Sequence, residues 1–557
     1  MKSLVLNIGL AISLGFIQLS ANEVTLNFAH MGDLHGHLIP RDHVTPGDAH
    51  VKQGGLAYLY SAIEDIRKQD KETILVNTGD TVQGGAEVLY TRGQAIITVL
   101  NEFNIDYGAL GNWDHLYGEK RTAEIFFNKD KLANWTSLVS NVYNKSTNKN
   151  LSAPYEIFER KGVKIGIIGF TSERPAMAVG PSGFDEIEFT NGDKEYEKYV
   201  KLLRPQVDVL VVISELGLAK NIQLAKKFPG VDVVFSSDMH EITTKEVVLD
   251  NGTVIVEEGA DGTRLGHIQL FVKDGKVTGY TFKMRTIDAN IKPNSKIAAL
   301  VEKVRAPFLK DTTAKTYKSQ FSEKALRGNI VKTVGETEID LHRSNFSDAP
   351  KMQAVIESSS HNFIAEAFRI ESGADLGVLR GFRYGTHVAK GDIVREDIFH
   401  YIPISPWIGI GEITGKQLLN YLENVAYGSL APNPSLWKGG WNHTVSGTKY
   451  DLNPNAEKGH MISNLCILQN GQYVAVDLNQ TYTIAGYTYD EEPNKVNKIP
   501  LKNVKIMLDK DGNKLEAYEI IENYLSKHNA NPELNRITLT TPLQKPTHGN
   551  REIQPLH

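Results

Sequence analysis

The segment Asn27-Phe-Ala-His-Met-Gly-Asp33-Leu-His35-Gly-His37 decides how the rest of the chain can be interpreted. It closes an apolar run that begins at Val24 and then gives way to glycine, aspartate and histidine. A short apolar run bounded by turn residues predicts a buried strand followed by a loop. This loop carries side chains that bind divalent cations, so the segment predicts a strand that delivers metal ligands.

Four later runs end in the same way. They occupy residues 74–80, 107–114, 207–215 and 231–240, and they stop at Gly-Asp80, Gly-Asn112, Glu215 and Asp238-Met-His240. In open α/β sheets, ligands bind outside the carboxyl ends of the strands. We therefore expect five loops, far apart in the chain, to assemble one site in a layered α/β fold.

Seven side chains in these loops are candidate metal ligands: Asp33, His35, Asp80, Asn112, Glu215, Asp238 and His240. Seven donors are too many for one tetrahedral ion and suit two octahedral ions that share Asp80 as a bridge. The set is rich in oxygen and free of sulfur, which favours two Mn²⁺, although Zn²⁺ or iron would also fit such ligands. For any single residue the alternative is a helix cap or a turn, and the combination favours the metal site.

Length and composition limit the class of protein. A chain of 557 residues is too long for one ordinary domain, so two large domains are expected. A formal net charge of −5 without a sustained basic block argues against nucleic acid as a partner. The single cysteine, Cys466, excludes an intramolecular disulfide, and its apolar neighbours predict a buried thiol.

The start of the chain has the pattern of an export signal. Lys2 precedes an apolar run over residues 4–19, and small residues lead to Ala21. This pattern predicts a secretory signal peptide over residues 1–21, with the periplasm as destination and no membrane attachment after cleavage. An uncleaved anchor is the alternative, but the run is short for a membrane span.

Periodicity divides the remainder into an α/β unit at 22–290, a bridging helix and linker at 291–340, a second α/β unit at 341–545 and a tail at 546–557. Helices are predicted at 55–67, 294–305 and 352–369, and a buried strand at 163–170. Hairpins are predicted to turn at Asn251-Gly252 and Asp274-Gly275. A strand followed by a helix capped by Thr414 is predicted at 408–418.

Three motifs carry a resemblance to a known family. Gly-Asp33-Leu-His35, Gly-Asp80 and Gly-Asn112, each after a strand, resemble the calcineurin-like metallophosphoesterases, and the segment 374–418 resembles the 5′-nucleotidase branch. The resemblance implies a layered α/β sandwich followed by a 5′-nucleotidase C-terminal-type domain. Three departures stand out: Trp113 replaces a catalytic histidine, Glu215-Leu-Gly replaces His-Leu-Gly, and Asp238-Met-His240 replaces His-x-His.

With these departures the sequence resembles the SoxB family, the dimanganese thiosulfohydrolases of the periplasmic Sox sulfur-oxidation system. The likeness extends to residues 342–348, 381–385, 437–441 and 549–555. It implies two Mn²⁺ and hydrolysis of the sulfonate from a cysteine S-thiosulfonate on the SoxYZ carrier protein, with sulfate released and transient contact with other Sox components. Two alternatives remain: a periplasmic 5′-nucleotidase or 2′,3′-cyclic phosphodiesterase, and a metal-binding docking module without turnover.

Trp113, Arg383 and Tyr384 are the candidate catalytic residues. A thiolate leaves more easily than an alkoxide, so a thiosulfohydrolase tolerates Trp113 where a phosphatase needs a general acid. Arg383 and Tyr384 match the region where 5′-nucleotidases hold substrate, and a guanidinium fork fits a sulfonate. For Trp113 the alternative is simple packing, and for Arg383 and the weaker candidate Arg343 it is an ion pair. Trp437 and Trp441 either line a channel for the carrier arm or pack in the core.

Overall fold

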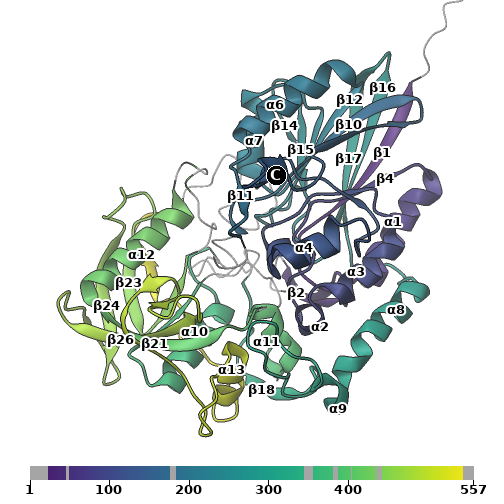
Figure 1. Ribbon diagram of the computed structural model, residues 1–557. Helices are drawn as coiled ribbons and strands as arrows, with labels where there is room; N and C mark the ends of the chain where they lie inside the picture. The colour runs from purple at the N-terminus through teal and green to yellow at the C-terminus, as the bar shows by residue number, and fades with distance from the viewer. Residues whose placement is uncertain are drawn as a thin grey trace, which may run out of the picture.

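The computed structural model describes residues 23–45, 49–175, 184–343, 355–380, 387–402, 404–431, 433, 436 and 442–543. The predicted signal peptide and tail lie outside these residues. Within the described ranges, no helix is both long enough and apolar enough to cross a membrane. The N-terminal part of the chain is built on two facing sheets, and the C-terminal part on a smaller one (Figure 1).

The first sheet has six strands in the order β17–β16–β1–β4–β5–β6. Its strands are β1 (Val24–Met31), β4 (Ile74–Asn77), β5 (Tyr107–Gly108), β6 (Thr136–Ser137), β16 (Arg264–Lys273) and β17 (Lys276–Thr286). β1, β4, β5 and β6 run parallel, whereas β16 and β17 are antiparallel and form the hairpin predicted at Asp274-Gly275.

The second sheet also has six strands, in the order β14–β15–β13–β12–β10–β9. Its strands are β9 (Tyr155–Arg160), β10 (Val163–Phe170), β12 (Val209–Ser214), β13 (Val233–Ser236), β14 (Val247–Val248) and β15 (Val254–Glu257). β10, β12, β13 and β15 are parallel, and β14 pairs with β15 across the turn predicted at Asn251-Gly252. The buried strand predicted at 163–170 is β10.

Alternation along the strands produces four layers. Because successive side chains of a strand point to opposite faces, Phe28 packs with Phe235 between the two sheets, whereas the next residue, Ala29, joins the core on the helical side. Burying Phe28 or Phe235 fully contributes about 1.5–3 kcal/mol each. The helices that cover the first sheet are α1 (Leu56–Gln69), α3 (Gln94–Leu100) and α8 (Ser295–Arg305), and those that cover the second are α6 (Asp193–Leu203) and α7 (Leu218–Lys227) (Figure 1).

Shorter elements complete this part of the chain. They are β2 (Arg41–Thr45), β3 (Ala49–Gln53), α2 (Ala86–Tyr90), α4 (Gly118–Phe126), β7 (Val142–Asn144), β8 (Lys149–Asn150) and β11 (Ile187–Phe189). The architecture confirms the predicted layered α/β sandwich, with antiparallel strands at one edge of the first sheet and at both edges of the second.

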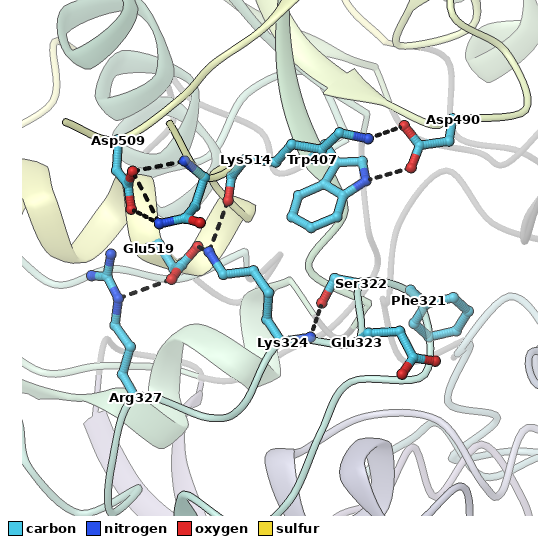
Figure 2. A pocket seen from close by; sticks show the side chains of 11 residues that line it. Phe321, Ser322, Glu323, Lys324, Arg327, Trp407, Asp490, Asp509, Lys514 and Glu519 are labelled. Carbon is cyan, nitrogen blue, oxygen red and sulfur yellow. Dashed lines mark hydrogen bonds and ion pairs between the residues drawn. The ribbon is translucent and has the colours of Figure 1, made fainter. Parts of the chain in front are cut away.

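The predicted bridging helix is α8, which begins where the Asn294 side chain accepts a hydrogen bond from the N–H of Ile297. The linker expected after it is a docked segment. It contains α9 (Asp311–Ala314), and Lys324 and Arg327 form ion pairs with Glu519 of α13 (Ala517–Leu525). Figure 2 shows these pairs at a cavity of about 590 Å³, which lies between the segment and the C-terminal domain.

The C-terminal part is centred on a five-stranded sheet in the order β22–β19–β26–β21–β29. Its elements are β18 (Thr333–Thr337), α10 (Ser359–Ser372), β19 (Leu376–Leu379), β20 (Gly391–Val394), α11 (Arg395–Tyr401), β21 (Trp407–Thr414), α12 (Gly415–Leu430), β22 (Thr444–Ser446), β23 (Thr448–Leu452), β24 (Ile462–Gln469), β25 (Gln472–Ala475), β26 (Thr481–Thr488), β27 (Lys495–Val496), β28 (Ile499–Pro500), β29 (Lys502–Ile506) and β30 (Ile537–Leu539). This second α/β unit is also as predicted.

Local predictions in this part were partly right. Thr414 caps α12, accepting from the N–H of Gln417 at 3.2 Å while Gln417 accepts from the N–H of Thr414 at 2.9 Å. α10 begins at Ser359, later than predicted, because the Ser358 side chain caps the helix. The prediction of a buried Cys466 was wrong: this residue of β24 is half-buried.

The two parts of the chain meet across a polar interface that adjoins a shared apolar core. Arg41 of β2 forms ion pairs with Glu396 and Asp397 of α11 at 3.1 Å and 2.8 Å. The His37 and His400 rings contact each other at an interplanar angle of 36°, with their centroids 4.3 Å apart. The predicted domain boundaries remain a prediction.

Candidate metal centre

The carboxyl ends of five parallel strands bring the candidate ligands together. Asp33 and His35 follow β1, Asp80 follows β4, Asn112 follows β5, Glu215 follows β12, and Asp238 and His240 follow β13. Five of the seven have positive φ, namely Asp33, His35, Asp80, Asp238 and His240. Residues other than glycine rarely adopt this conformation, and such strain concentrates at functional sites.

Close backbone contacts between loops fix this arrangement. The N–H of Asp33 donates to the carbonyl of Gly79 at 2.9 Å, and the N–H of His35 donates to the carbonyl of Asp80 at 2.9 Å. A Cβ atom at Gly111 would lie 2.0 Å from Asp80 Oδ1. The glycine before Asn112 is therefore required, because any side chain there would displace Asp80.

Two groups of side chains could each hold an ion. One consists of Asp33, His35 and His240, the other of Asp33, Asp80 and Glu215, and within each group the ligand atoms lie within 4.8 Å of one another. Asp33 Oδ1 is 3.5 Å from the Nε2 atoms of both histidines. Asp33 is thus the residue that the two groups share, and the bridging role predicted for Asp80 remains a prediction.

The chemistry of these groups fits divalent cations. Asp33, Asp80 and Glu215 are completely buried, and neither Asp33 Oδ1 nor Asp80 Oδ2 accepts a hydrogen bond from any residue that the structure describes. Burial and the nearby charge of Asp33 raise the pKa of Asp80 well above its ordinary value. Buried carboxylates of this kind are stable when they coordinate metal ions.

The contacts and the burial of His35 favour the neutral tautomer that can bind a metal ion. Its Nδ1 atom lies 3.0 Å from Gln83 Oε1, a carboxamide oxygen that can accept a hydrogen bond but cannot donate one. This contact places the imidazole proton on Nδ1, so that Nε2, which lies 2.9 Å from Nε2 of His240, presents its lone pair as a ligand atom. Burial lowers the pKa of His35 to about 4, so the ring is neutral near pH 7.

Asn112 and Asp238 form the edge of the site. With its amide nitrogen toward Asp238, Asn112 donates to Asp238 Oδ1 at 3.3 Å and accepts from Trp113 Nε1 at 3.2 Å. The backbone N–H of Trp113 also donates to Asp80 Oδ1 at 2.8 Å. Asp238 in turn forms an ion pair with Arg174. Neither Asn112 nor Asp238 belongs to the two groups above, so their ligand roles remain predictions.

Three functional neighbours were missed by sequence reasoning. Gln83 and Arg174 lie in loops without a recognisable motif. Asp114 is within the Gly-Asn-Trp-Asp motif, where its carboxylate accepts from the backbone N–H groups of Thr81 and Gly111 at 2.8 Å and 2.9 Å. It therefore ties together the loops that carry Asp80 and Asn112.

Of the five arginine, tyrosine and tryptophan candidates in the second domain, Arg343 alone lies within the described residues. Arg383, Tyr384, Trp437 and Trp441 lie outside the described residues. Arg343 is buried, and its guanidinium donates to the carbonyl of Asn442 at 3.3 Å, which is a structural contact within the C-terminal domain.

Comparisons with known proteins agree with this architecture. A family model for calcineurin-like phosphoesterases matches residues 26–241, and one for the 5′-nucleotidase C-terminal domain matches residues 333–494. A 5′-nucleotidase of Vibrio cholerae is 23% identical over 397 residues, which cover 65% of this chain and 69% of that protein.

Two solved structures from Thermus thermophilus have the same fold. Sulfate thiohydrolase SoxB superposes with a TM-score of 0.77 at 17% identity, over 94% of this chain and 98% of that one. A 5′-nucleotidase precursor superposes with a TM-score of 0.76 at 21% identity, over 93% of this chain and 100% of that one.

The calcineurin-like fold implies a dinuclear metal site, and the buried groups around Asp33 supply donors for it. Residues 26–241 therefore match a calcineurin-like phosphoesterase domain and residues 333–494 a 5′-nucleotidase C-terminal domain, and the fold is that of hydrolases of the metallophosphoesterase/5′-nucleotidase type.

Proposed function

We propose that this protein is a periplasmic thiosulfohydrolase, which hydrolyses the sulfonate from a cysteine S-thiosulfonate on the SoxYZ carrier protein and releases sulfate. The observation that carries the proposal is Trp113. Its indole N–H lies 3.2 Å from the Asn112 carboxamide, beside the candidate ligands, and an indole has no proton that it can give up near neutral pH.

The low basicity of the leaving group explains how a site without a general acid can hydrolyse this substrate. Water attacks the sulfonate sulfur, the S–S bond breaks, and its electron pair leaves with the sulfane sulfur that stays on the carrier. The parent thiol of an ordinary thiolate has a pKa of about 8.5, so such a group departs without protonation. An alkoxide departs poorly unless it is protonated, so a general acid speeds the reaction of a phosphomonoesterase.

The metal pair, proposed as two Mn²⁺, would activate the water and neutralise charge on the sulfonate oxygens. Asp33, Asp80 and Glu215 would hold the ions together with His35 and His240, and Asn112 and Asp238 would complete the set at its edge. Gln83 keeps His35 in the coordinating tautomer. Arg383 and Tyr384 would contact the substrate from the second domain.

A second candidate is a 5′-nucleotidase or 2′,3′-cyclic phosphodiesterase. The names of relatives such as the Vibrio cholerae 5′-nucleotidase favour it, as does the match of residues 333–494 to the 5′-nucleotidase C-terminal domain. Trp113 argues against it, because a nucleotide ester must expel an alkoxide. The periplasmic location rests on the predicted signal peptide at residues 1–21.

One assay separates these candidates. Purified protein loaded with Mn²⁺ is incubated with SoxYZ carrying thiosulfate on its cysteine and, separately, with a nucleoside monophosphate and a 2′,3′-cyclic nucleotide. We expect sulfate release from the carrier at a rate far above phosphate release from either nucleotide. Phosphate release without sulfate release would refute the thiosulfohydrolase proposal, and no turnover of any substrate would favour a docking module.

A further inference from the structure

The seven proposed metal ligands lie beneath the surface of the protein, and each of these residues is at most 3% exposed. A folded domain of a carrier cannot press a modified cysteine against such ligands, because the residues around them keep its surface at a distance. A substrate that is attached to a protein therefore reaches the centre on a narrow, extended segment of chain. That segment needs a passage from the surface.

A cavity of about 340 Å³ runs from the edge of the centre to the surface. Its inner wall contains Asp238, Leu216 and Met239, which are buried. Its outer wall contains the exposed residues Gln223 and Lys227. We call this cavity the α7 groove, because residues from both ends of helix α7 line it. Its inner end lies beside a proposed ligand, and its outer end opens to solvent.

The α7 groove follows one face of the helix. The helical residues that line it have the spacing i, i+3, i+4 and i+7, which places them on the same side of α7: Lys220, Gln223, Leu224 and Lys227. From Gly217, at the inner end, to Lys227 the helix rises about 1.5 Å per residue, so the groove is about 15 Å long. An extended chain advances about 3.3 Å per residue, so about four or five residues span this length.

The absence of a side chain at Gly217 keeps the inner end of the groove open. A Cβ atom there would lie 3.0 Å from Met239 Cγ and 3.5 Å from Asp238 Oδ2. Gly217 also has a φ of 84°, which residues with a side chain rarely adopt. Pockets for small ligands have volumes of about 300–1,000 Å³, so this groove admits a few residues of peptide and no folded domain.

The polar groups of the groove suit a peptide backbone. Arg174 forms an ion pair with Asp238. Lys220 Nζ lies 3.7 Å from a carboxylate oxygen of Glu173 and 3.8 Å from one of Asp193. Because these two cations already have acidic partners, the inner part of the groove does not select for an anion. Its walls carry both N–H donors and carboxylate acceptors, and an extended peptide presents one N–H and one carbonyl per residue.

We propose that the α7 groove is the docking site for the carrier segment that bears the modified cysteine. With the sulfonate at the metal centre beside Asp238, about four or five residues of the segment lie extended along α7 and leave the groove at Lys227. The burial of the ligands requires such a passage, and the length, width and hydrogen-bonding groups of the groove match a peptide strand. This inference rests on the proposed function and deepens it, because it names the surface that recognises the carrier.

Two neighbouring lysines at the end of α7 allow a matched test. Lys226 and Lys227 are both exposed, but of the two only Lys227 lines the groove. Lys227→Trp places a bulky ring at the mouth of the groove, whereas Lys226→Trp makes the same chemical change beside it. Gln223→Trp blocks the groove one turn further in. The dissociation constant of unmodified SoxYZ from each Mn²⁺-loaded, full-length variant is measured by calorimetry, together with metal content and Tm.

We expect Lys227→Trp and Gln223→Trp each to weaken carrier binding at least about tenfold while they keep their metal ions and the wild-type Tm, and Lys226→Trp to stay within about threefold of the wild type. Wild-type affinity in either groove variant, an equal loss in Lys226→Trp, or a loss that occurs only together with loss of metal would overturn the inference. It would also be overturned if the wild type does not bind SoxYZ. A wild type that binds SoxYZ but releases no sulfate would refute the thiosulfohydrolase proposal alone.

Discussion

Asp33 lies in the middle of the candidate metal centre. Burial would raise the pKa of its carboxyl, but the nearby His240 and His35 hold that pKa below its ordinary value. Its Oδ2 accepts from the N–H of Asp238 at 3.0 Å, while its Oδ1 faces the two histidines. One carboxylate thus connects the loops after β1 and β13 and belongs to both ligand groups.

The first prediction concerns this carboxylate. Asp33→Asn should lower the metal content below two ions per chain and reduce sulfate release by at least about a thousandfold, because both groups lose a charged ligand. Metal analysis and the sulfate assay measure these effects. Asp185→Asn, at an exposed carboxylate, is the control. Full metal content in Asp33→Asn would contradict the assignment.

The second prediction concerns Trp113. Trp113→His introduces a titratable donor beside Asn112, and we expect a gain of about tenfold or more in phosphate release from nucleoside monophosphates, since alkoxide departure benefits most from a general acid. Trp113→Phe, which cannot donate a proton, is the control. No gain in a Trp113→His protein that still binds both metals would count against the leaving-group argument.

At the scale of elements, local capping decides where helices begin. α12 starts at Thr414 because the side chains and backbone N–H groups of Thr414 and Gln417 satisfy one another. The preceding strand, β21, is an inner strand of the C-terminal sheet, between β26 and β29. The cap therefore fixes the point at which the chain leaves that sheet.

The third prediction tests this cap. Thr414→Ala should lower the free energy of unfolding by about 1 kcal/mol, because the N–H of Gln417 loses its acceptor. Thr414→Ser keeps the hydroxyl and should remain within about 0.5 kcal/mol of the wild type. Denaturant unfolding measures both values. Equal stability of the alanine and serine variants would mean that the cap contributes nothing.

At the scale of the whole molecule, histidines lie along the boundary between the two parts of the chain. The rings of His43, from β2, and His387, from the C-terminal part, have centroids 5.2 Å apart. No described residue forms a hydrogen bond with His43 Nε2, which is inaccessible to solvent. Burial, together with the charges of Arg264 and Arg41, lowers the pKa of His43 from 6.5 to about 3.

The fourth prediction follows from that shift. Between pH 6.5 and about 3 the folded protein binds fewer protons at His43 than the unfolded chain does, so stability falls as the pH is lowered through this range. His43 alone contributes a slope of up to about 1.4 kcal/mol per pH unit. His43→Phe keeps a ring against His387 and should flatten the slope, measured by thermal unfolding from pH 7 to 4. His528→Gln, at an exposed histidine, should leave it unchanged.

The sequence alone determined the fold class and the chemical class of the site. Short apolar runs and the glycines after them are local signals, and strands such as β1, β4 and β12 end where those runs end. The candidate metal ligands come shortly after these strands in the sequence. The order of residues is therefore enough to group Asp33, Asp80 and Glu215 as candidate ligands of one site. The capped start of α12 was predictable for the same reason, since Thr414 and Gln417 are neighbours on one turn.

Only the tertiary structure decided which of these side chains meet and what lies between them. Gln83 reaches His35 across 48 residues, Arg174 reaches Asp238 across 64, and His240 reaches His35 across 205. No periodicity relates such positions, because their proximity depends on how strands of two sheets align. The ion pairs that dock the segment after α9 against Glu519 arise in the same way, since surface lysines and arginines give no sign of their partners in the sequence.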